Sequence, residues 1–374
     1  MADFRIACIV GARPNFMKMA PILRALAAYP AIEPVLIHTG QHYDPNLSDV
    51  FFDDLDMRRP DIYLEVGSGT HAEQTARVLE RLEQVFLDAN KVGKPFDRVL
   101  VVGDVNSTMA AALVAAKLHI PVAHVEAGLR SFDRTMPEEI NRIVTDAIAD
   151  MLLVSEPSGV DNLKAEGKPA SQIHLVGNVM IDTLRHQIPK ARSRNVLERM
   201  GLTPGEYGVI TLHRPANVDT PDVLAKLLDV LAEAATRLPM IFPVHPRTKH
   251  RIEQFGLGDR LNGKARGGIV EAEPLGYLDF LCLTSQAKVI VTDSGGLQEE
   301  STALGVPCLT MRPNTERPIT VEEGTSTLIG NDADRLRSVL ASVLEGTYKQ
   351  GRCPELWDGK AAERIAARLA ADAG

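Results

Sequence analysis

The sequence has few cysteines, no long basic run and no apolar run long enough to cross a bilayer. Each absence excludes a class of protein. The four cysteines are scattered without a CxxC pair, which argues against a zinc site and suits free thiols in the cytoplasm: Cys8, Cys282, Cys308 and Cys353. A net charge of −8 without a basic run argues against a nucleic-acid or anionic-membrane partner. We therefore expect neither nucleic acid nor membrane as a partner.

The 374 residues, of which 45% are apolar, are too many for one ordinary core and predict two domains. The N-terminal stretch MADFRIACIVGARP has Asp3 and Arg5 where a signal peptide would be apolar. We interpret it as a first strand. A polar stretch over 185–207 predicts the boundary between an N-terminal domain, 1–185, and a C-terminal domain, 186–355.

Short β-rich apolar runs alternate with helix-patterned stretches in both halves. This alternation predicts two doubly wound, Rossmann-like parallel sheets with helices on both faces. The predicted strands cover 5–10, 33–38, 98–103, 121–126, 151–155 and 173–177, then 208–213, 240–245, 268–273, 288–293 and 307–312. The predicted helices cover 23–29, 71–86, 107–118, 137–150, 223–236, 296–304 and 361–374.

Polar residues follow many of the predicted strands where each strand ends. Open parallel sheets bind ligands outside these carboxyl ends, so two such edges predict a ligand held between facing domains. In the first half these residues are Arg13, His38, Asp104 and Glu126, and in the second half they are His213, His245, Asp293 and Arg312.

Asp104 and Glu126 end two consecutive predicted strands that are separated by one helix. Neighbouring strands lie about 4.8 Å apart, so the two carboxylates could converge on one substrate atom. Because close carboxylates repel, one would stay protonated and serve as an acid beside a base. In the alternative interpretation Asp104 caps the following helix and Glu126 pairs with Arg130.

The stretch VIVTDSGGLQEE, residues 289–300, predicts a strand, a small-residue turn and a helix start. Backbone N–H groups of Ser294, Gly295 and Gly296 at the positive end of a helix dipole would suit a diphosphate. An ordinary turn with Ser294 as N-cap is the alternative. Glu300 could reach a ribose hydroxyl, or it could be a solvated surface residue.

Two further motifs carry charge near predicted strand ends. In GARPNFMK, residues 11–18, Gly11 permits a tight turn while Arg13 and Lys18 could bind phosphate; a solvated surface loop is the alternative. In ITLHRPANVD, residues 210–219, His213 could hydrogen-bond a phosphate or move a proton.

The stretch TMPEEINR, residues 135–142, has the spacing of a helix start. Thr135 and Glu138 match a capping box, Pro137 suits a first turn, and Glu138 and Arg142 are spaced as an ion pair. Its position shortly after Glu126 favours a role in the site as well.

Two patterns resemble a dinucleotide-binding and a metal-binding motif, but their sequence context argues against both kinds of site. VGSGTHA, residues 66–72, fits GxGxxA but lacks the context of a dinucleotide site. Asp54–Leu55–Asp56 resembles a metal-binding DxD but lies in an acidic run. We expect no metal.

The motifs together resemble the bacterial non-hydrolysing UDP-N-acetylglucosamine 2-epimerases over nearly the whole chain. They are GARPNFMKMAP, TGQH, GDVNST, HVEAGLRS, MPEEINR, VGN, TLHRPANV, DSGGLQEES, GVPCLTMR and NTERP. The resemblance implies a GT-B fold in which a C-terminal helix, 356–374, packs back on the N-terminal domain. It also implies a homodimer that needs no cofactor and takes a UDP-sugar as substrate.

The implied reaction interconverts UDP-GlcNAc and UDP-ManNAc by eliminating UDP to 2-acetamidoglucal and adding it back with inversion at C2. Matching motifs imply four catalytic residues, Asp104, Glu126, Glu138 and His213. They imply UDP contacts by Arg13, Lys18, Ser294, Gly295, Gly296 and Glu300, sugar or cleft contacts by Arg142 and Asn178, and a place near uracil for Tyr277.

Some positions depart from the family pattern. Many members have Glu where Asn15, Ala216 and Ile319 stand. Residues that would serve activation by a second UDP-GlcNAc are altered at Tyr43, Asp44, Ser68 and Gly69, which puts such activation in doubt. A hydrolysing 2-epimerase, an epimerase of a related UDP-2-acetamido sugar and a GT-B glycosyltransferase remain alternatives.

Overall fold

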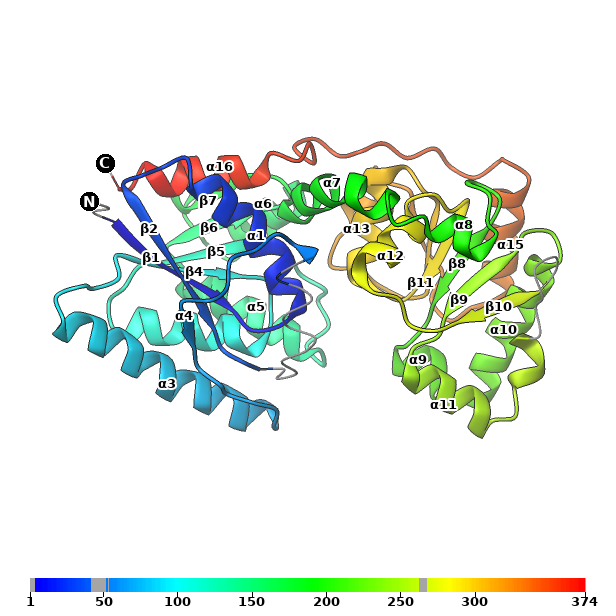
Figure 1. Ribbon diagram of the computed structural model, residues 1–374, viewed down its shortest axis with the longest axis horizontal. Helices are drawn as coiled ribbons and strands as arrows, with labels where there is room; N and C mark the ends of the chain where they lie inside the picture. Colours follow the sequence, from blue (N-terminus) through cyan, green and yellow to red (C-terminus); the bar gives the residue numbers. More distant parts are fainter. Residues whose placement is uncertain (1–3, 42–51, 53, 262–267, 374) are drawn as a thin grey trace. The chain divides into compact units, whose positions relative to one another are not determined.

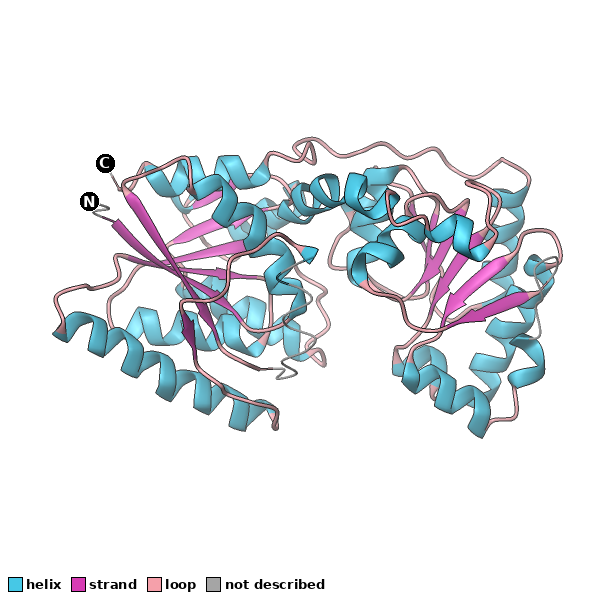
Figure 2. Ribbon diagram, viewed as in Figure 1, coloured by secondary structure: helices cyan, strands magenta, loops and turns pink. Residues whose placement is uncertain are grey.

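The computed structural model describes residues 4–41, 52, 54–261 and 268–373 (Figure 1). The chain forms two compact units. Unit 1 comprises Met1–Leu184 and Glu355–Gly374, and unit 2 comprises Arg185–Pro354. Each unit has a parallel sheet with helices on both faces (Figure 2).

Unit 1 is built on a seven-stranded sheet in the order β3-β2-β1-β4-β5-β6-β7, in which all pairings are parallel. Its central strands are buried on both faces, as apolar runs such as RVLVV dictate. The strands are β1 Phe4–Val10, β2 Ile32–His38, β3 Ile62–Tyr63, β4 Arg98–Val102, β5 Val122–Ala127, β6 Met151–Val154 and β7 Ile173–Leu175.

The helices of unit 1 include α3, which begins at a Thr70 N-cap. Thr70 Oγ1 accepts from Glu73 N, and the Glu73 carboxylate accepts from Thr70 N, so the GxGxxA pattern ends in a capping box. The helices are α1 Arg13–Leu26, α3 His71–Lys91, α4 Asn106–Lys117, α5 Pro137–Ile148, α6 Pro157–Ala165 and α16 Ala361–Ala370, with a 3₁₀ turn at Ala170–Gln172. Helix α7, Val179–Arg192, begins in unit 1 and ends in unit 2.

Unit 2 repeats the plan with a six-stranded parallel sheet in the order β10-β9-β8-β11-β12-β13. The strands are β8 Gly208–Thr211, β9 Met240–Pro243, β10 Ile269–Ala272, β11 Val289–Thr292, β12 Cys308–Thr310 and β13 Ser326–Leu328. The helices are α8 Val196–Met200, α9 Pro215–Val218, α10 Pro221–Ala235, α11 Pro246–Gln254, α12 Tyr277–Thr284, α13 Gly295–Leu304, α14 Ile319–Glu322 and α15 Ala333–Leu344, with a 3₁₀ turn at Gly258–Leu261.

The C-terminal segment belongs to unit 1, where α16 packs alongside α1 (Figure 1). The fully buried Trp357 donates its indole N–H to the carbonyl of Ser155. Asp182 of α7 accepts hydrogen bonds from Ala361 N and Ala362 N at the start of α16. Burial raises the pKa of Asp182 to about 6, against the lowering effect of these two amides.

The predicted fold class of two doubly wound parallel sheets is confirmed, and every predicted strand is present. The prediction omitted β3 and β13, which are two and three residues long and lie at sheet edges. The first helix begins at Arg13, earlier than the predicted 23–29, and α7 runs through the predicted boundary at 185. Within the described ranges, no helix combines the length and apolarity needed to span a membrane.

Gly177 provides a test of how tightly the C-terminal segment packs. Its φ is +87°, and an added Cβ would lie 2.1 Å from the carbonyl oxygen of Leu356. We expect Gly177→Ala to destabilise the protein by at least about 2 kcal/mol more than Gly167→Ala in denaturation experiments.

Gly167 is the matched control because it has the same kind of backbone, with φ +82°, but an added Cβ would meet nothing within 4 Å. The control substitution therefore carries only the cost of a left-handed alanine, about 1 kcal/mol. Equal destabilisation by the two alanines would show that the Leu356 contact contributes nothing.

Candidate active site

Asp104 and Glu126 lie at the carboxyl ends of two paired strands of unit 1. Strands β4 and β5 are hydrogen-bonded neighbours with Val102 opposite Val125, which meets the condition for the two carboxylates to lie close together. Asp104 follows β4 by two residues, and Glu126 is the fifth residue of β5. The sheet register therefore brings the two carboxylates to one edge.

Glu126 is held in an unusual backbone conformation. Its φ is +74°, and the pairing of β5 with β6 shifts register between Val125 and Ala127. A non-glycine residue in this region stores about 1–3 kcal/mol of strain, which must be offset by surrounding contacts. Glu126 is buried, and the residue as a whole is only 5% exposed.

Lys18 of α1 forms a buried ion pair with Glu126. Both side chains are 6% exposed, so each charge would be costly without the other. The close approach of Gly103 completes this packing: with φ +68°, it has no Cβ, and an added one would lie 2.9 Å from Lys18 Nζ. The arrangement keeps a cation against Glu126.

Arg142 of α5 connects Asp104 to a second buried carboxylate. Its Nη1 contacts Asp104 Oδ2 at 2.5 Å, and its Nη2 donates to Glu139 Oε2 at 2.9 Å. Glu139 also accepts from the amides of Ser131 and Phe132. Burial would raise the pKa of Glu139, but these hydrogen bonds and Arg142 hold it below its usual value. Arg142 is thereby fixed as the partner of Asp104.

Asp146, one turn further along α5, anchors the strand end beneath the site. It is fully buried, and its Oδ1 lies 2.6 Å from His124 Nδ1. Its Oδ2 accepts from Gly128 N at 3.0 Å and pairs with Arg130 at 2.7 Å. Burial would raise the pKa of Asp146, but His124 and Arg130 lower it. The end of β5, which carries Glu126, is therefore tied to α5.

The expected capping box at the start of α5 is wrong. The helix begins at Pro137 with Met136 as N-cap, and no side chain caps it. Thr135 instead donates its hydroxyl to Asp133 Oδ1 at 2.6 Å. The expected Glu138–Arg142 pair is also replaced, because Arg142 faces the interior while Glu138 is exposed.

The structural alternatives for Asp104 and Glu126 are wrong as well. Val105 is the N-cap of α4, and no side chain caps that helix. Arg130 is close to Glu126 in sequence but pairs with Asp146 and Glu166 instead.

The surface-loop interpretation of GARPNFMK fails because α1 begins at Arg13 and buries Lys18. Arg13 itself is exposed. Gly11 needs no left-handed backbone; its smallness matters because an added Cβ would lie 2.4 Å from Ser107 Oγ. The side chain of Asn15 accepts from the amides of Gly11 and Ala12.

His38, also at a strand end, is buried and stacks on Phe16 with ring centroids 5.2 Å apart. Burial lowers the pKa of His38 to about 4. A neutral ring packed among aromatic groups is part of the core, so His38 does not add to the charged cluster.

In unit 2, Ser294 is the N-cap of α13, and Gly295 and Gly296 are its first two residues. The Ser294 hydroxyl makes no capping hydrogen bond, and all three residues are partly exposed. The first-turn amides of α13 therefore lie at an accessible, positive helix end that suits an anion.

A buried ion cluster supports this turn. Glu316 contacts Arg312 at 2.8 Å and Arg317 at 2.9 Å, and Arg317 contacts Glu299 at 2.8 Å. An added Cβ on Gly295 would lie 3.4 Å from both Arg317 Nη1 and Glu316 Oε1. A larger side chain at Gly295 would press on the cluster, so glycine permits this approach.

The remaining predicted residues of the site are placed as follows. His213 follows β8 and lies 2.8 Å from Asp293. Glu300 in α13, Tyr277 at the start of α12 and Asn178 before α7 are buried, and Asn178 Oδ1 accepts from Met180 N. Ser68 and Gly69 precede α3, whereas Tyr43 and Asp44 lie outside the described residues.

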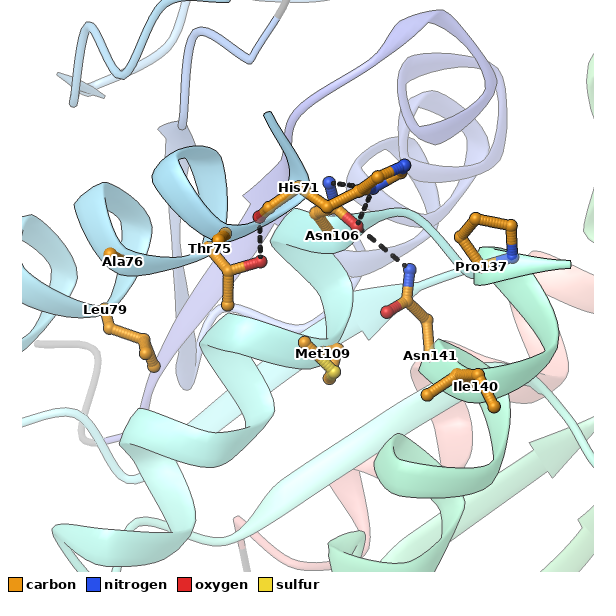
Figure 3. A pocket seen from close by; sticks show the side chains of 10 residues that line it. His71, Thr75, Ala76, Leu79, Asn106, Met109, Pro137, Ile140 and Asn141 are labelled. Carbon is orange, nitrogen blue, oxygen red and sulfur yellow. Dashed lines mark hydrogen bonds between the residues drawn. The ribbon is translucent and has the colours of Figure 1, made fainter. Parts of the chain in front are cut away.

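A hollow of about 470 Å³ lies between α3, α4 and α5 on unit 1 (Figure 3). Apolar side chains including Leu79, Met109 and Ile140 line it. At its rim Asn141 Nδ2 donates to Asn106 Oδ1 at 3.3 Å and to the carbonyl of Asp104 at 2.9 Å. The sequence did not predict this hollow.

The described part of the chain contains no group of three or more His, Cys, Asp or Glu residues that could hold a metal. Asp54, from the DxD pattern, lies in a short helical stretch, and Asp56 follows it with φ +51°.

Sequence reasoning missed Glu139, Asp146 and Asn141 as supports of the site. A signal existed: Glu139, Arg142 and Asp146 are spaced i, i+3, i+7, so three charged residues share one face of a helix that must pack on the sheet. Charges on a core-facing stripe require partners, which the strand ends supply.

Asp146→Asn tests whether the buried charge holds the site together. Removing one partner of a buried ion network costs about 3–5 kcal/mol, which for a unit of this size lowers the melting temperature by roughly 10 °C. Asp88→Asn, which removes a surface pair with Lys91, serves as control and should change it by no more than about 2 °C.

The pH dependence has a definite sign. Because the pKa of Asp146 is lower in the folded chain, its ionisation stabilises the fold above the unfolded pKa of about 3.9, and this stabilisation is lost as the pH falls further. The Asp146→Asn variant should therefore lose less stability than the parent protein on acidification. Parallel pH profiles would contradict this role.

Comparisons with known proteins agree with these features. The family model for UDP-N-acetylglucosamine 2-epimerase matches residues 24–370. The chain is similar to a UDP-N-acetylglucosamine 2-epimerase of Methanocaldococcus jannaschii, with 42% identity over 96% of this chain and 97% of that protein. It is 39% identical to a UDP-2,3-diacetamido-2,3-dideoxy-D-glucuronate 2-epimerase of Pseudomonas aeruginosa over 98% of this chain and 99% of that one.

Among solved structures, the UDP-GlcNAc 2-epimerase of M. jannaschii in complex with UDP-GlcNAc and UDP has a TM-score of 0.85. Its identity is 40%, and the match covers 98% of this chain and all of that one. The predicted GT-B class is confirmed by such neighbours together with the two parallel sheets. The family predicted from the motifs is confirmed too: the chain belongs to the UDP-N-acetylglucosamine 2-epimerase family.

Proposed function

We propose that the protein is an isomerase that interconverts UDP-N-acetylglucosamine and UDP-N-acetylmannosamine without releasing free sugar. Family membership over nearly the whole chain supports this reaction. The observation that carries it is the pair of carboxylates, Asp104 and Glu126, at the ends of neighbouring strands, each with its own buried cation.

The chemistry explains why such a pair is needed. The proton on C2 of the sugar is next to no carbonyl group, so simple deprotonation is difficult. Elimination breaks the C1–O bond as the C2 proton leaves, giving 2-acetamidoglucal and UDP. UDP then adds back while a proton reaches the opposite face of C2. One face of the ring therefore needs a base and the other an acid.

Unit 1 supplies residues for these proton transfers in our proposal. Glu126 and Asp104 differ in surroundings: Glu126 is buried beside Lys18, whereas the side chain of Asp104 is 26% exposed beside Arg142. Exposed Glu138 at the start of α5 is the third proposed carboxylate. Different environments suit different proton-transfer roles, and we leave the assignment of acid and base open.

Unit 2 would hold the UDP moiety. The first-turn amides at Ser294, Gly295 and Gly296 fit the diphosphate, and Glu300 in the same helix would bind the ribose. His213 would act on the departing or returning diphosphate. The remaining proposed substrate contacts are Arg13, Lys18, Arg142, Asn178 and Tyr277.

Besides the proposed substrate contacts, we propose that Lys18 and Arg142 orient the catalytic carboxylates. Each is buried and directed at a proposed catalytic carboxylate, Lys18 at Glu126 and Arg142 at Asp104. Fixed charges of this kind orient a reacting group before the substrate arrives, so less reorganisation is needed during the reaction.

A second substrate is favoured by one observation. The similarity to the P. aeruginosa 2-epimerase, whose substrate is a UDP-diacetamido-uronate, is nearly as strong as that to the M. jannaschii enzyme. Both reactions invert C2 beside an acetamido group, so the same carboxylates would serve either sugar. We further propose that the protein works in the cytoplasm as a homodimer.

Incubation with UDP-GlcNAc and, in a separate sample, with the UDP-diacetamido-uronate, each in D₂O and followed by NMR, tests the reaction. We expect UDP-ManNAc with deuterium at C2, because a deuteron from the solvent replaces the proton that was removed. Free ManNAc would instead identify a hydrolysing enzyme, and an acceptor-dependent product a glycosyltransferase. Turnover of only the diacetamido-uronate would identify the second substrate.

Asp104→Asn tests the carboxylate chemistry. We expect turnover to fall by about 10²–10⁴-fold, because the amide cannot transfer the proton. UDP affinity, measured by calorimetry, should stay within about threefold, a free-energy change below 1 kcal/mol. Asp161→Asn, an exposed position on α6, serves as control. Near-normal turnover of Asp104→Asn would remove Asp104 from the catalytic residues.

A further inference from the structure

We propose that Asp293 is a positioning residue that holds the imidazole of His213 in the tautomer protonated at Nδ1, so that Nε2 is the atom presented to the substrate. Asp293 lies directly between the end of β11 and Ser294, and His213 follows β8. The inference deepens the proposed function, because it concerns the same site.

The two side chains meet in a geometry that orients the ring. Asp293 Oδ1 lies 2.8 Å from His213 Nδ1. Asp293 is completely buried, whereas the side chain of His213 is 42% exposed. The buried carboxylate therefore contacts the Nδ1 edge of the ring, and Nε2 lies on the opposite edge.

The other oxygen of Asp293 is held by three N–H groups. Asp293 Oδ2 accepts from His213 N at 2.9 Å, Arg214 N at 2.8 Å and Asn217 Nδ2 at 3.1 Å. These donors fix the rotation of the carboxylate and leave Oδ1 for the imidazole. Burial would raise the pKa of Asp293, but the hydrogen bonds from His213 and its neighbours lower it.

An ionised carboxylate has no proton to donate, so its 2.8 Å contact with His213 is favourable only when the proton is on Nδ1. Neutral His213 then offers a lone pair at Nε2, and protonated His213 offers an N–H at the same atom. A proton can thus pass between His213 and a diphosphate oxygen without rotation of the ring. A buried carboxylate that orients a histidine in this way can be worth several orders of magnitude in rate.

His245 provides a contrast within the same edge of unit 2. Its ring centroid lies 5.6 Å from that of His213, but its Nδ1 accepts from Arg247 N at 3.2 Å. Neutral His245 must therefore carry its proton on Nε2. Burial lowers the pKa of His245, and repulsion from His213 and Arg247 lowers it further.

The tautomers can be measured directly by ¹⁵N NMR of histidine-labelled protein at a pH at which the rings are neutral. In the parent protein we expect His213 to be protonated at Nδ1 and His245 at Nε2. His213→Gln and His245→Gln variants assign the signals. A His213 ring protonated at Nε2 in the parent protein would overturn the inference without any need for an Asp293 variant.

Asp293→Asn is the matched perturbation. The amide oxygen can replace Oδ2 as acceptor for the three N–H groups, which places the amide NH₂ opposite His213 Nδ1. We expect the His213 proton to move to Nε2 while His245 stays unchanged. An unchanged His213 tautomer in a folded variant would contradict the positioning role.

Kinetics provide a second readout. We expect kcat of Asp293→Asn to fall by at least about 100-fold with KM within about threefold, because binding groups remain and the acceptor atom is lost. Asn217→Ala removes one donor to Asp293 but no charge, so its His213 tautomer should be that of the parent. A comparable loss of kcat in Asn217→Ala would indicate loop distortion and overturn the inference.

The two proposals can fail separately. If the tautomers are as expected but no C2 inversion is detected with any UDP-sugar, the proposed function fails while the orientation of His213 stands. If the enzyme epimerises UDP-GlcNAc but His213 is protonated at Nε2, the function stands and the positioning role of Asp293 is wrong.

Discussion

Pairing of buried ionised side chains at the ends of parallel strands is the constraint on which this structure depends. Glu126, Asp146, Glu139 and Asp293 are all buried, and each would be too costly in the interior without a partner. The partners are a lysine, two arginines and two histidines, supplied mostly by the helices and loops that follow the strands. The same contacts that make burial tolerable also fix the side chains in place.

This constraint explains why the polar groups of unit 1 form a connected set. Arg142 joins Asp104 to Glu139, and Glu139 in turn accepts from the loop amides at Ser131 and Phe132. Asp146 holds the preceding part of that loop through Gly128. The strained backbone of Glu126 lies within this support, which is where strain can be maintained. Ion pairs with buried cations therefore hold the proposed catalytic carboxylates in place.

Unit 2 uses the same physics for a different purpose. Its buried carboxylate, Asp293, holds backbone amides and contacts an imidazole, while the next residue, Ser294, is the N-cap of α13, where we propose that the diphosphate binds. One strand end thus supports both the proposed diphosphate site and the proposed proton-transfer histidine. The neighbouring ion cluster of Arg312, Glu316 and Arg317 packs close to Gly295 in this turn.

The sequence by itself determined the two parallel sheets, the strand ends that carry polar residues and the family. Apolar runs, helical periodicity and ordered motifs are local signals, and they sufficed for these features. Local signals did not predict the ion-pair partners of the charged residues. Sequence spacing favoured Glu126 with Arg130 and Glu138 with Arg142, whereas the fold pairs Glu126 with Lys18 and Arg142 with Asp104. Those pairs span 108 and 38 residues. Only the tertiary structure decides them, because strand order and helix packing, and not distance along the chain, determine which charges are buried together.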